Sequence, residues 1–128
     1  NLGTNDFSAY PVPDSAAWED AVVAFVGRIR KAYGKVPVVL ADGPMLSDWW
    51  PNKPDGKPFP TLTTVRRHLE NAAKRMEGVS VLHLSPNEAS RGYGADWHPN
   101  RAQAELNGQE LARRLSDLLG WKTESRRR

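Results

Sequence analysis

An acid and a histidine that could act together lie two residues apart, at Asp96 and His98. In a short loop, the carboxylate can accept a hydrogen bond from one ring nitrogen and leave the other free to take a proton. A helix capped by Asn100 and Gln103 would place its positive end near His98 and favour the neutral imidazole. The pattern predicts a general base at His98 oriented by Asp96. The simpler alternative is a helix cap or a surface histidine.

Two other segments hold residues that could contribute to a site. The turn Gly3-Thr4-Asn5-Asp6 contains an Asn and an Asp, residue types that bond their own backbone in turns. Trp49 and Trp50 lie in a loop from Asp42 to Pro60 that contains five prolines. A loop of this length is typically functional or disordered.

The remaining histidines predict no chemistry. His68 falls on the polar side of its predicted helix, and His83 lies in a predicted strand, where a satisfied core or edge histidine is expected. No set of His, Asp and Glu has the spacing of a metal site. The sequence contains no cysteine, which excludes disulfides, thiolate ligands and a cysteine nucleophile. We therefore expect neither a metal nor a cofactor.

The elements that position these residues alternate between helices and strands. The predicted segments are a strand end at 1–2, a helix at 15–33, a strand at 36–41, a helix at 62–76, a strand at 79–84 and a helix from 101 that Gly120 ends. This order predicts an α/β fold, a three-layer sandwich with a mostly parallel sheet that here lacks its N-terminal strands. The polar turns all follow strands, at the sheet edge where ligands bind.

Composition narrows the classes of function. The 128 residues form one domain at most, predicted as 1–121, with a basic tail at 122–128 that we expect to be disordered. The three C-terminal arginines account for the whole net charge of +3, so charge gives no support to nucleic-acid binding. No apolar run is long enough for a membrane span or a signal peptide. The missing initial methionine suggests a processed or cut piece of a longer protein.

Three stretches together resemble the SGNH (GDSL-type) hydrolases. Gly3-Thr4-Asn5-Asp6 resembles their G-x-N-D block, and Asp96-Trp97-His98 resembles their D-x-x-H block. The sequence is most similar to carbohydrate esterase family two, the acetyl xylan esterase-like deacetylases, at 1–8, 43–46 and 94–99. The resemblance identifies the chain as the C-terminal portion of such a catalytic domain, with an SGNH, flavodoxin-like architecture.

This resemblance implies a serine esterase that deacetylates carbohydrate, acetylated xylan or a related polysaccharide, through an acyl-serine intermediate. His98 would deprotonate the serine and later protonate the leaving sugar hydroxyl, with Asp96 orienting its ring. Asn5 would donate to the oxyanion across a pocket shared with His98. Gly3 and Asp6 would support the turn that carries Asn5.

The resemblance also suggests where substrate binds. Trp97 would line the acyl pocket, and Trp49 or Trp50 would stack on a sugar ring. The alternative for this tryptophan pair is that it pins its loop against the body of the protein. The family further implies a secreted protein, with no nucleic-acid or membrane partner.

The blocks that should supply the nucleophile are not found in this chain. The family's G-D-S turn and its second block belong before Asn1, and no serine from Ser8 to Ser116 has nucleophile-elbow surroundings. An alternative function is therefore a catalytically inactive fragment or a carbohydrate-binding module that uses the Trp49/Trp50 loop. A third is a peptidoglycan or lipid esterase of the same superfamily. The open sheet edge predicts pairing with a missing N-terminal part of the domain, or self-association.

Overall fold

The computed structural model describes residues 3–121, and the chain divides into two compact units, Asn1–Pro86 and Asn87–Arg128. The first unit contains η1 (Asn5–Phe7), α1 (Ser15–Tyr33), β1 (Val38–Ala41), α2 (Thr61–Lys74) and β2 (Val79–Leu82). The second contains η2 (Ala89–Arg91), η3 (Ala95–Trp97) and α3 (Arg101–Leu119). The predicted strand end at 1–2 and the predicted disordered tail at 122–128 lie outside the described residues.

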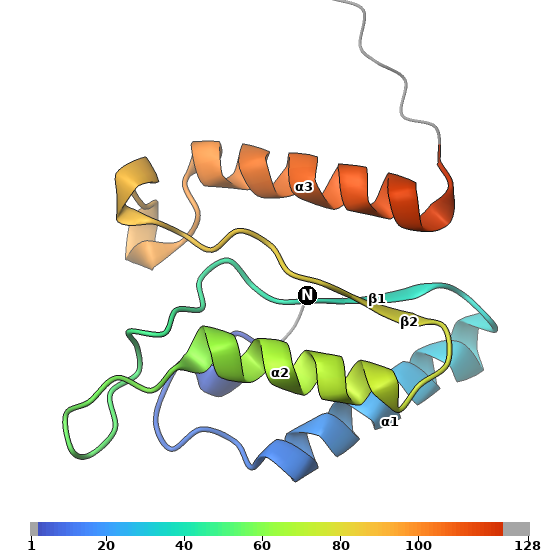
Figure 1. The fold of residues 1–128 in the computed structure, drawn as a ribbon, viewed down its shortest axis with the longest axis horizontal. Helices are drawn as coiled ribbons and strands as arrows, with labels where there is room; N and C mark the ends of the chain where they lie inside the picture. Colours follow the sequence, from blue (N-terminus) through green and yellow to red (C-terminus); the bar gives the residue numbers. More distant parts are fainter. Residues whose placement is uncertain (1–2, 122–128) are drawn as a thin grey trace, which may run out of the picture. The chain divides into compact units, whose positions relative to one another are not determined.

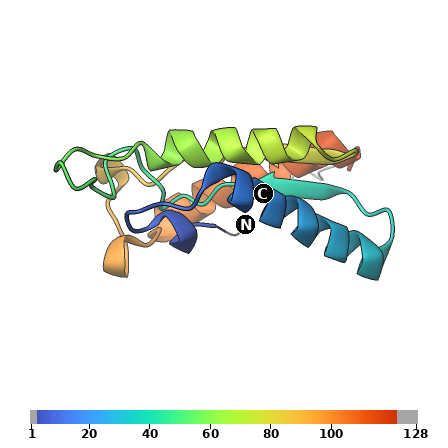
Figure 2. The same cartoon turned by 90° about the horizontal axis from the view of Figure 1, so that it is seen from below.

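The first unit is a helix–strand assembly in which β1 and β2 pair in parallel, from Val38 opposite Val79 to Ala41 opposite Leu82. Helix α2 packs against both strands and α1 packs against α2 (Figure 1; Figure 2). The predicted α/β class with a parallel sheet is confirmed. The helices begin and end within two residues of the predicted positions. In α1, for example, Asp14 caps the first turn and Gly34 follows the last.

The core of this unit is small and lies beside α2. Its buried members are Phe7, Leu46, Val65 and Leu69. Partly buried apolar side chains surround them, namely Val12, Trp18, Leu40, Leu62 and Val81. The short turn η1 contributes Phe7, whose ring meets the Trp18 ring edge-on with 5.2 Å between centroids. This contact fixes the turn that carries Asn5 against α1.

His68 is buried, so its predicted position on the polar side of α2 is wrong. Its side chain is 5% exposed, and its Nδ1 lies 2.7 Å from Glu19 Oε1 on α1. Asn71 donates to the same carboxylate oxygen. Burial by itself raises the pKa of Glu19, but these hydrogen bonds and the charges of His68 and Arg75 outweigh it and hold that pKa below its ordinary value. The partner that satisfies the buried ring, a carboxylate on α1, could not be predicted from the residues around His68.

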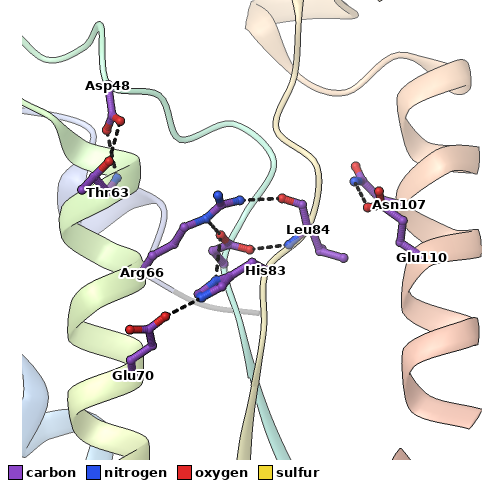
Figure 3. Close-up of polar contacts among 9 residues, drawn as sticks. Asp48, Thr63, Arg66, Glu70, His83, Leu84, Asn107 and Glu110 are labelled. Atoms are coloured by element: carbon purple, nitrogen blue, oxygen red, sulfur yellow. Dashed lines mark hydrogen bonds and ion pairs between the residues drawn. The ribbon is translucent and has the colours of Figure 1, made fainter. Parts of the chain in front are cut away.

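Asp42 joins the end of β1 to the residues that follow β2. It is 1% exposed. Its Oδ1 accepts a hydrogen bond from the Leu84 N–H at 2.7 Å, and its Oδ2 accepts one from Arg66 Nε at 2.6 Å (Figure 3). His83 lies just beyond the end of β2, with Nδ1 3.4 Å from Asp42 Oδ2 and Nε2 3.1 Å from Glu70 Oε1. The strand ends at Leu82, earlier than predicted, and the Leu84 amide bonds this carboxylate.

Asp42→Ala is expected to lower the free energy of unfolding by about 2–3 kcal/mol, because it removes the acceptor for a buried amide and for Arg66. Urea unfolding followed by circular dichroism measures the change. Asp20→Ala is the matched control: its partner Arg75 and Asp20 are both well exposed, so the loss there is expected to stay below about 1 kcal/mol. Equal losses in the two variants would contradict the role given to Asp42.

An apolar groove of about 490 Å³ lies between α1 and β1 within the first unit. Helix α1 forms one wall with Val22, Phe25 and Ile29, and all four residues of β1 form the other. Among the described residues, β1 has β2 as its only strand neighbour. A strand edge without a neighbour in that range is a site at which another strand can pair.

Candidate active site

The segment that carries Asp96 and His98 has a strained backbone. Asp96 and Trp97 both adopt left-handed conformations, with φ of 49° and 63°. This region is uncommon for any residue with a side chain and is unfavourable for one as bulky as tryptophan. Each such residue costs on the order of 1–3 kcal/mol, and strain of this kind clusters at functional sites. The geometry singles out this turn from the rest of the second unit.

Hydrogen bonds from both sides maintain the strained turn. Asn87 Nδ2 donates to the Trp97 carbonyl at 2.8 Å, and the Gly94 N–H donates to the His98 carbonyl at 2.8 Å. Glycine is favoured at position 94, because a Cβ there would make a tight contact, 3.2 Å from the carbonyl oxygens of His98 and Pro99. Asn87 was not predicted as part of the site, because no motif surrounds it.

The ring of His98 is oriented by a backbone carbonyl. Its Nδ1 lies 3.0 Å from the Ala95 oxygen. When Nδ1 carries the proton it donates to this carbonyl, and Nε2 is then the basic nitrogen. Asp96 and His98 are separated by one residue, whereas D-x-x-H has two, so the position three before the histidine belongs to Ala95. At that position the main chain supplies an acceptor.

Helix α3 anchors the turn. Asn100 is the N-cap, as predicted: its side-chain oxygen accepts from the Gln103 N–H at 2.9 Å. The Asn100 amide also donates to the Arg91 carbonyl at 2.6 Å. Gln103 is 1% exposed, and its side-chain oxygen accepts from Arg91 Nε at 2.6 Å. Two residues at the start of α3, Asn100 and Gln103, thus bond Arg91 in the loop that precedes the turn, and these bonds connect the two ends of the segment that contains His98.

The Gly3–Asp6 turn is built against α1. Gly3 has a φ of +102°, and a Cβ there would lie 2.9 Å from the indole of Trp18. Asp6 Oδ2 accepts from Trp18 Nε1 at 3.1 Å, which ties the turn to the helix. Asn5 is exposed, and its backbone oxygen accepts from the Ser8 N–H and hydroxyl. These contacts hold the main chain of Asn5 in place.

The three candidate substrate-binding tryptophans are all exposed, by 80% for Trp49, 61% for Trp50 and 72% for Trp97. The indole of Trp50 donates to the Ser8 carbonyl at 2.9 Å, so this ring also fixes its loop near η1. The Trp97 ring meets Tyr93 edge-on, with 5.1 Å between centroids. Asn5, Trp49 and Trp50 belong to the first unit, and Asp96, Trp97 and His98 to the second.

Within residues 3–121, no group of three or more His, Cys, Asp or Glu side chains could hold a metal ion. No helix in that range has the length and apolar character needed to cross a membrane.

Comparison with known proteins confirms the resemblance drawn from the sequence blocks. A carbohydrate esterase family 2 enzyme with a carbohydrate binding domain, from Corynascus thermopiles (Myceliophthora fergusii), matches 94% of the chain at 36% identity and a TM-score of 0.78. A family two carbohydrate esterase from Clostridium thermocellum, solved with cellohexaose, matches 95% of it at 27% identity and a TM-score of 0.78. No family model matches the chain.

A curated protein gives the same result. The cellulase/esterase CelE of Acetivibrio thermocellus is 28% identical over 123 residues, or 94% of this chain. The chain spans 14% of the length of CelE and about a third of the two solved chains, 36% and 35%. It therefore corresponds to one portion of a longer carbohydrate esterase in each case.

Proposed function

We propose that this chain is the base-bearing portion of an SGNH-type serine esterase that removes acetyl groups from carbohydrate, acetylated xylan or a related polysaccharide. The observation that carries the proposal is the orientation of the His98 ring by a main-chain carbonyl within a strained turn. The match of nearly the whole chain to carbohydrate esterases of family 2 supports it.

The proposed chemistry proceeds by acyl transfer. A serine hydroxyl attacks the acetyl carbonyl while His98 Nε2 takes its proton. This serine would come from the family's G-D-S turn, which is not found in this chain. The side-chain amide of Asn5 donates to the negative oxygen of the tetrahedral intermediate. The intermediate then releases the sugar hydroxyl, which receives the proton from His98. Water then attacks the acyl-serine while His98 Nε2 takes its proton, and the second tetrahedral intermediate releases acetate and the serine oxygen, which receives the proton back from His98.

Two groups compete for the role of orienting the His98 ring. The Ala95 carbonyl lies at Nδ1, whereas Asp96 is the carboxylate that the sequence block predicts for that role. We propose that the carbonyl suffices to hold the tautomer and that Asp96 contributes mainly through its charge. Asp6 and Gly3 act on Asn5 only through the backbone of their turn.

We propose that the exposed tryptophans bind the carbohydrate, Trp97 beside the acyl group and Trp49 or Trp50 on a sugar ring. Indole faces suit the C–H-rich faces of pyranose rings, and the Clostridium enzyme was solved with cellohexaose. The exposure of Trp49 also favours a second candidate, a carbohydrate-binding module or inactive fragment. An assay with an activated acetyl ester separates the two when the chain is combined with a serine-bearing N-terminal segment, because only the esterase portion then supports turnover. We also propose secretion, because the substrate is a polysaccharide outside the cell.

The groove along β1 supports the proposal that this chain pairs with an N-terminal part of the domain or with a second copy of itself. We expect the isolated chain to self-associate with rising concentration, because pairing removes apolar surface and an open strand edge from water. Light scattering measures the mass. Phe25→Lys, in the groove wall, is expected to give a monomer, and Tyr33→Lys, which is exposed and does not line the groove, is the control. A monomer at all concentrations would contradict the pairing.

A further inference from the structure

The loop that carries Trp49 is joined to the first turn of α2. A helix begins with backbone N–H groups that have no partner within it, and the N-cap of α2, Pro60, provides no side-chain acceptor. The loop provides the acceptors: the Ser47 carbonyl accepts from the Leu62 N–H at 3.2 Å, and Asp48 Oδ1 accepts from the Thr63 N–H at 2.9 Å. The start of α2 and the loop therefore stabilise each other.

Asp48 makes the stronger part of this connection. Its Oδ2 accepts from the Thr63 hydroxyl at 2.6 Å, so that one carboxylate bonds both the main chain and the side chain of Thr63 (Figure 3). A negative charge at the start of a helix is also favoured by the helix dipole. On the other side of Trp49, the Trp50 carbonyl accepts from the Thr61 hydroxyl at 2.8 Å. Both neighbours of Trp49 are thus attached to the same helix turn.

Trp49 is held out into solvent by these attachments. Trp49 is 80% exposed, the largest exposed fraction among the large hydrophobic residues of the described chain. A mobile loop would have to be ordered when a ligand binds the ring, and that ordering would weaken binding. A loop already fixed to α2 avoids this cost. This advantage applies when the Trp49 ring binds a ligand.

We propose that Asp48 is a positioning residue that holds Trp49 as a preorganised stacking surface for a β-linked sugar chain. The proposal rests on the carbohydrate specificity proposed above. Asp48 does not contact the sugar itself and acts through the main chain of Trp49. Its loss is expected to weaken binding through increased loop motion.

The test compares cellohexaose binding, by calorimetry, with hydrogen exchange of residues 47–51 in the same variants of the full 128-residue chain. Asp48→Ala is expected to weaken cellohexaose binding about tenfold and to speed exchange in the loop. Asp48→Asn keeps an acceptor for the Thr63 N–H and can donate to its hydroxyl, so it is expected to restore most of the affinity. Thr63→Val removes only the hydroxyl bond and is expected to give an intermediate loss of affinity. It replaces Asp48→Ala in the test if that variant does not fold. Asp55→Ala, in the same loop, is the control and leaves both measurements unchanged.

The outcomes separate this inference from the proposed function. Wild-type binding that Trp49→Ala removes, together with weak binding and fast exchange in Asp48→Ala, supports the positioning role. Wild-type binding that Asp48→Ala leaves unchanged overturns the role of Asp48 alone. A wild-type chain that binds neither cellohexaose nor xylohexaose overturns the stacking role of Trp49, and it also contradicts the proposed carbohydrate specificity.

Discussion

His98→Ala is expected to lower kcat/KM for an activated acetyl ester by at least about a thousandfold, because it removes the only base in the proposed acyl transfer. The variant is expected to fold normally, since the imidazole is exposed and its hydrogen bond is to a carbonyl only three residues away. Steady-state hydrolysis of 4-nitrophenyl acetate measures the effect, with the chain reconstituted with a serine-bearing N-terminal segment as described below. Unchanged circular dichroism and unfolding curves establish that the loss is chemical.

Asp96→Asn is the matched control for this prediction. The Ala95 carbonyl lies at Nδ1, so loss of the Asp96 charge is expected to reduce kcat by about tenfold or less. An orienting carboxylate in a catalytic triad is worth about ten thousandfold. A loss of that size in Asp96→Asn would mean that the carboxylate reaches Nδ1 during turnover and would contradict the role given to Ala95.

Asn5→Ala is expected to reduce kcat by about a hundredfold to a thousandfold with little change in KM, because an oxyanion donor acts mainly in the transition state. Stability is expected to change little, since Asn5 is exposed and its backbone oxygen makes the bonds that hold the turn. The same ester assay measures kcat and KM separately.

Two variants test whether the donor is the side-chain amide. Asn5→Asp has the same shape but provides no N–H and places a negative charge beside the oxyanion, so its loss should equal or exceed that of Asn5→Ala. Ser8→Ala removes a neighbouring hydroxyl that bonds the Asn5 carbonyl and is expected to leave kcat unchanged. A fully active Asn5→Asp would show that some other group stabilises the oxyanion.

Local signals predicted the secondary structure well. The helix from Ser15 to Tyr33 follows from its apolar period, with Asp14 as cap and Gly34 after its last turn. The start of α3 after Asn100 follows from its capping side chain. These features depend on residues within a few positions of one another, which is why one sequence suffices to predict them. The parallel pairing of β1 and β2 follows from the alternation of elements.

Partners distant in the sequence could not be predicted in the same way. The buried His68 has its partner, Glu19, on another helix and 49 residues away in the sequence. Asp48 caps a helix from a loop 15 residues before its partner. The Ala95 carbonyl has no side-chain signature at all, and the strain at Asp96 and Trp97 is a property of the backbone. The side chains proposed for the candidate site could therefore be chosen from the sequence. The distant residues and backbone groups that position them could not.

Ester hydrolysis by a reconstituted domain tests the central claim most directly. The chain is mixed with the segment of the Corynascus enzyme that precedes the region matched by this chain, where the proposed mechanism requires the serine to lie. Turnover of 4-nitrophenyl acetate is measured for each part and for the mixture. We expect turnover in the mixture, and we expect His98→Ala in this chain to abolish it. A mixture whose turnover is unchanged by His98→Ala, or a chain that binds cellohexaose while no mixture turns over the ester, would contradict it.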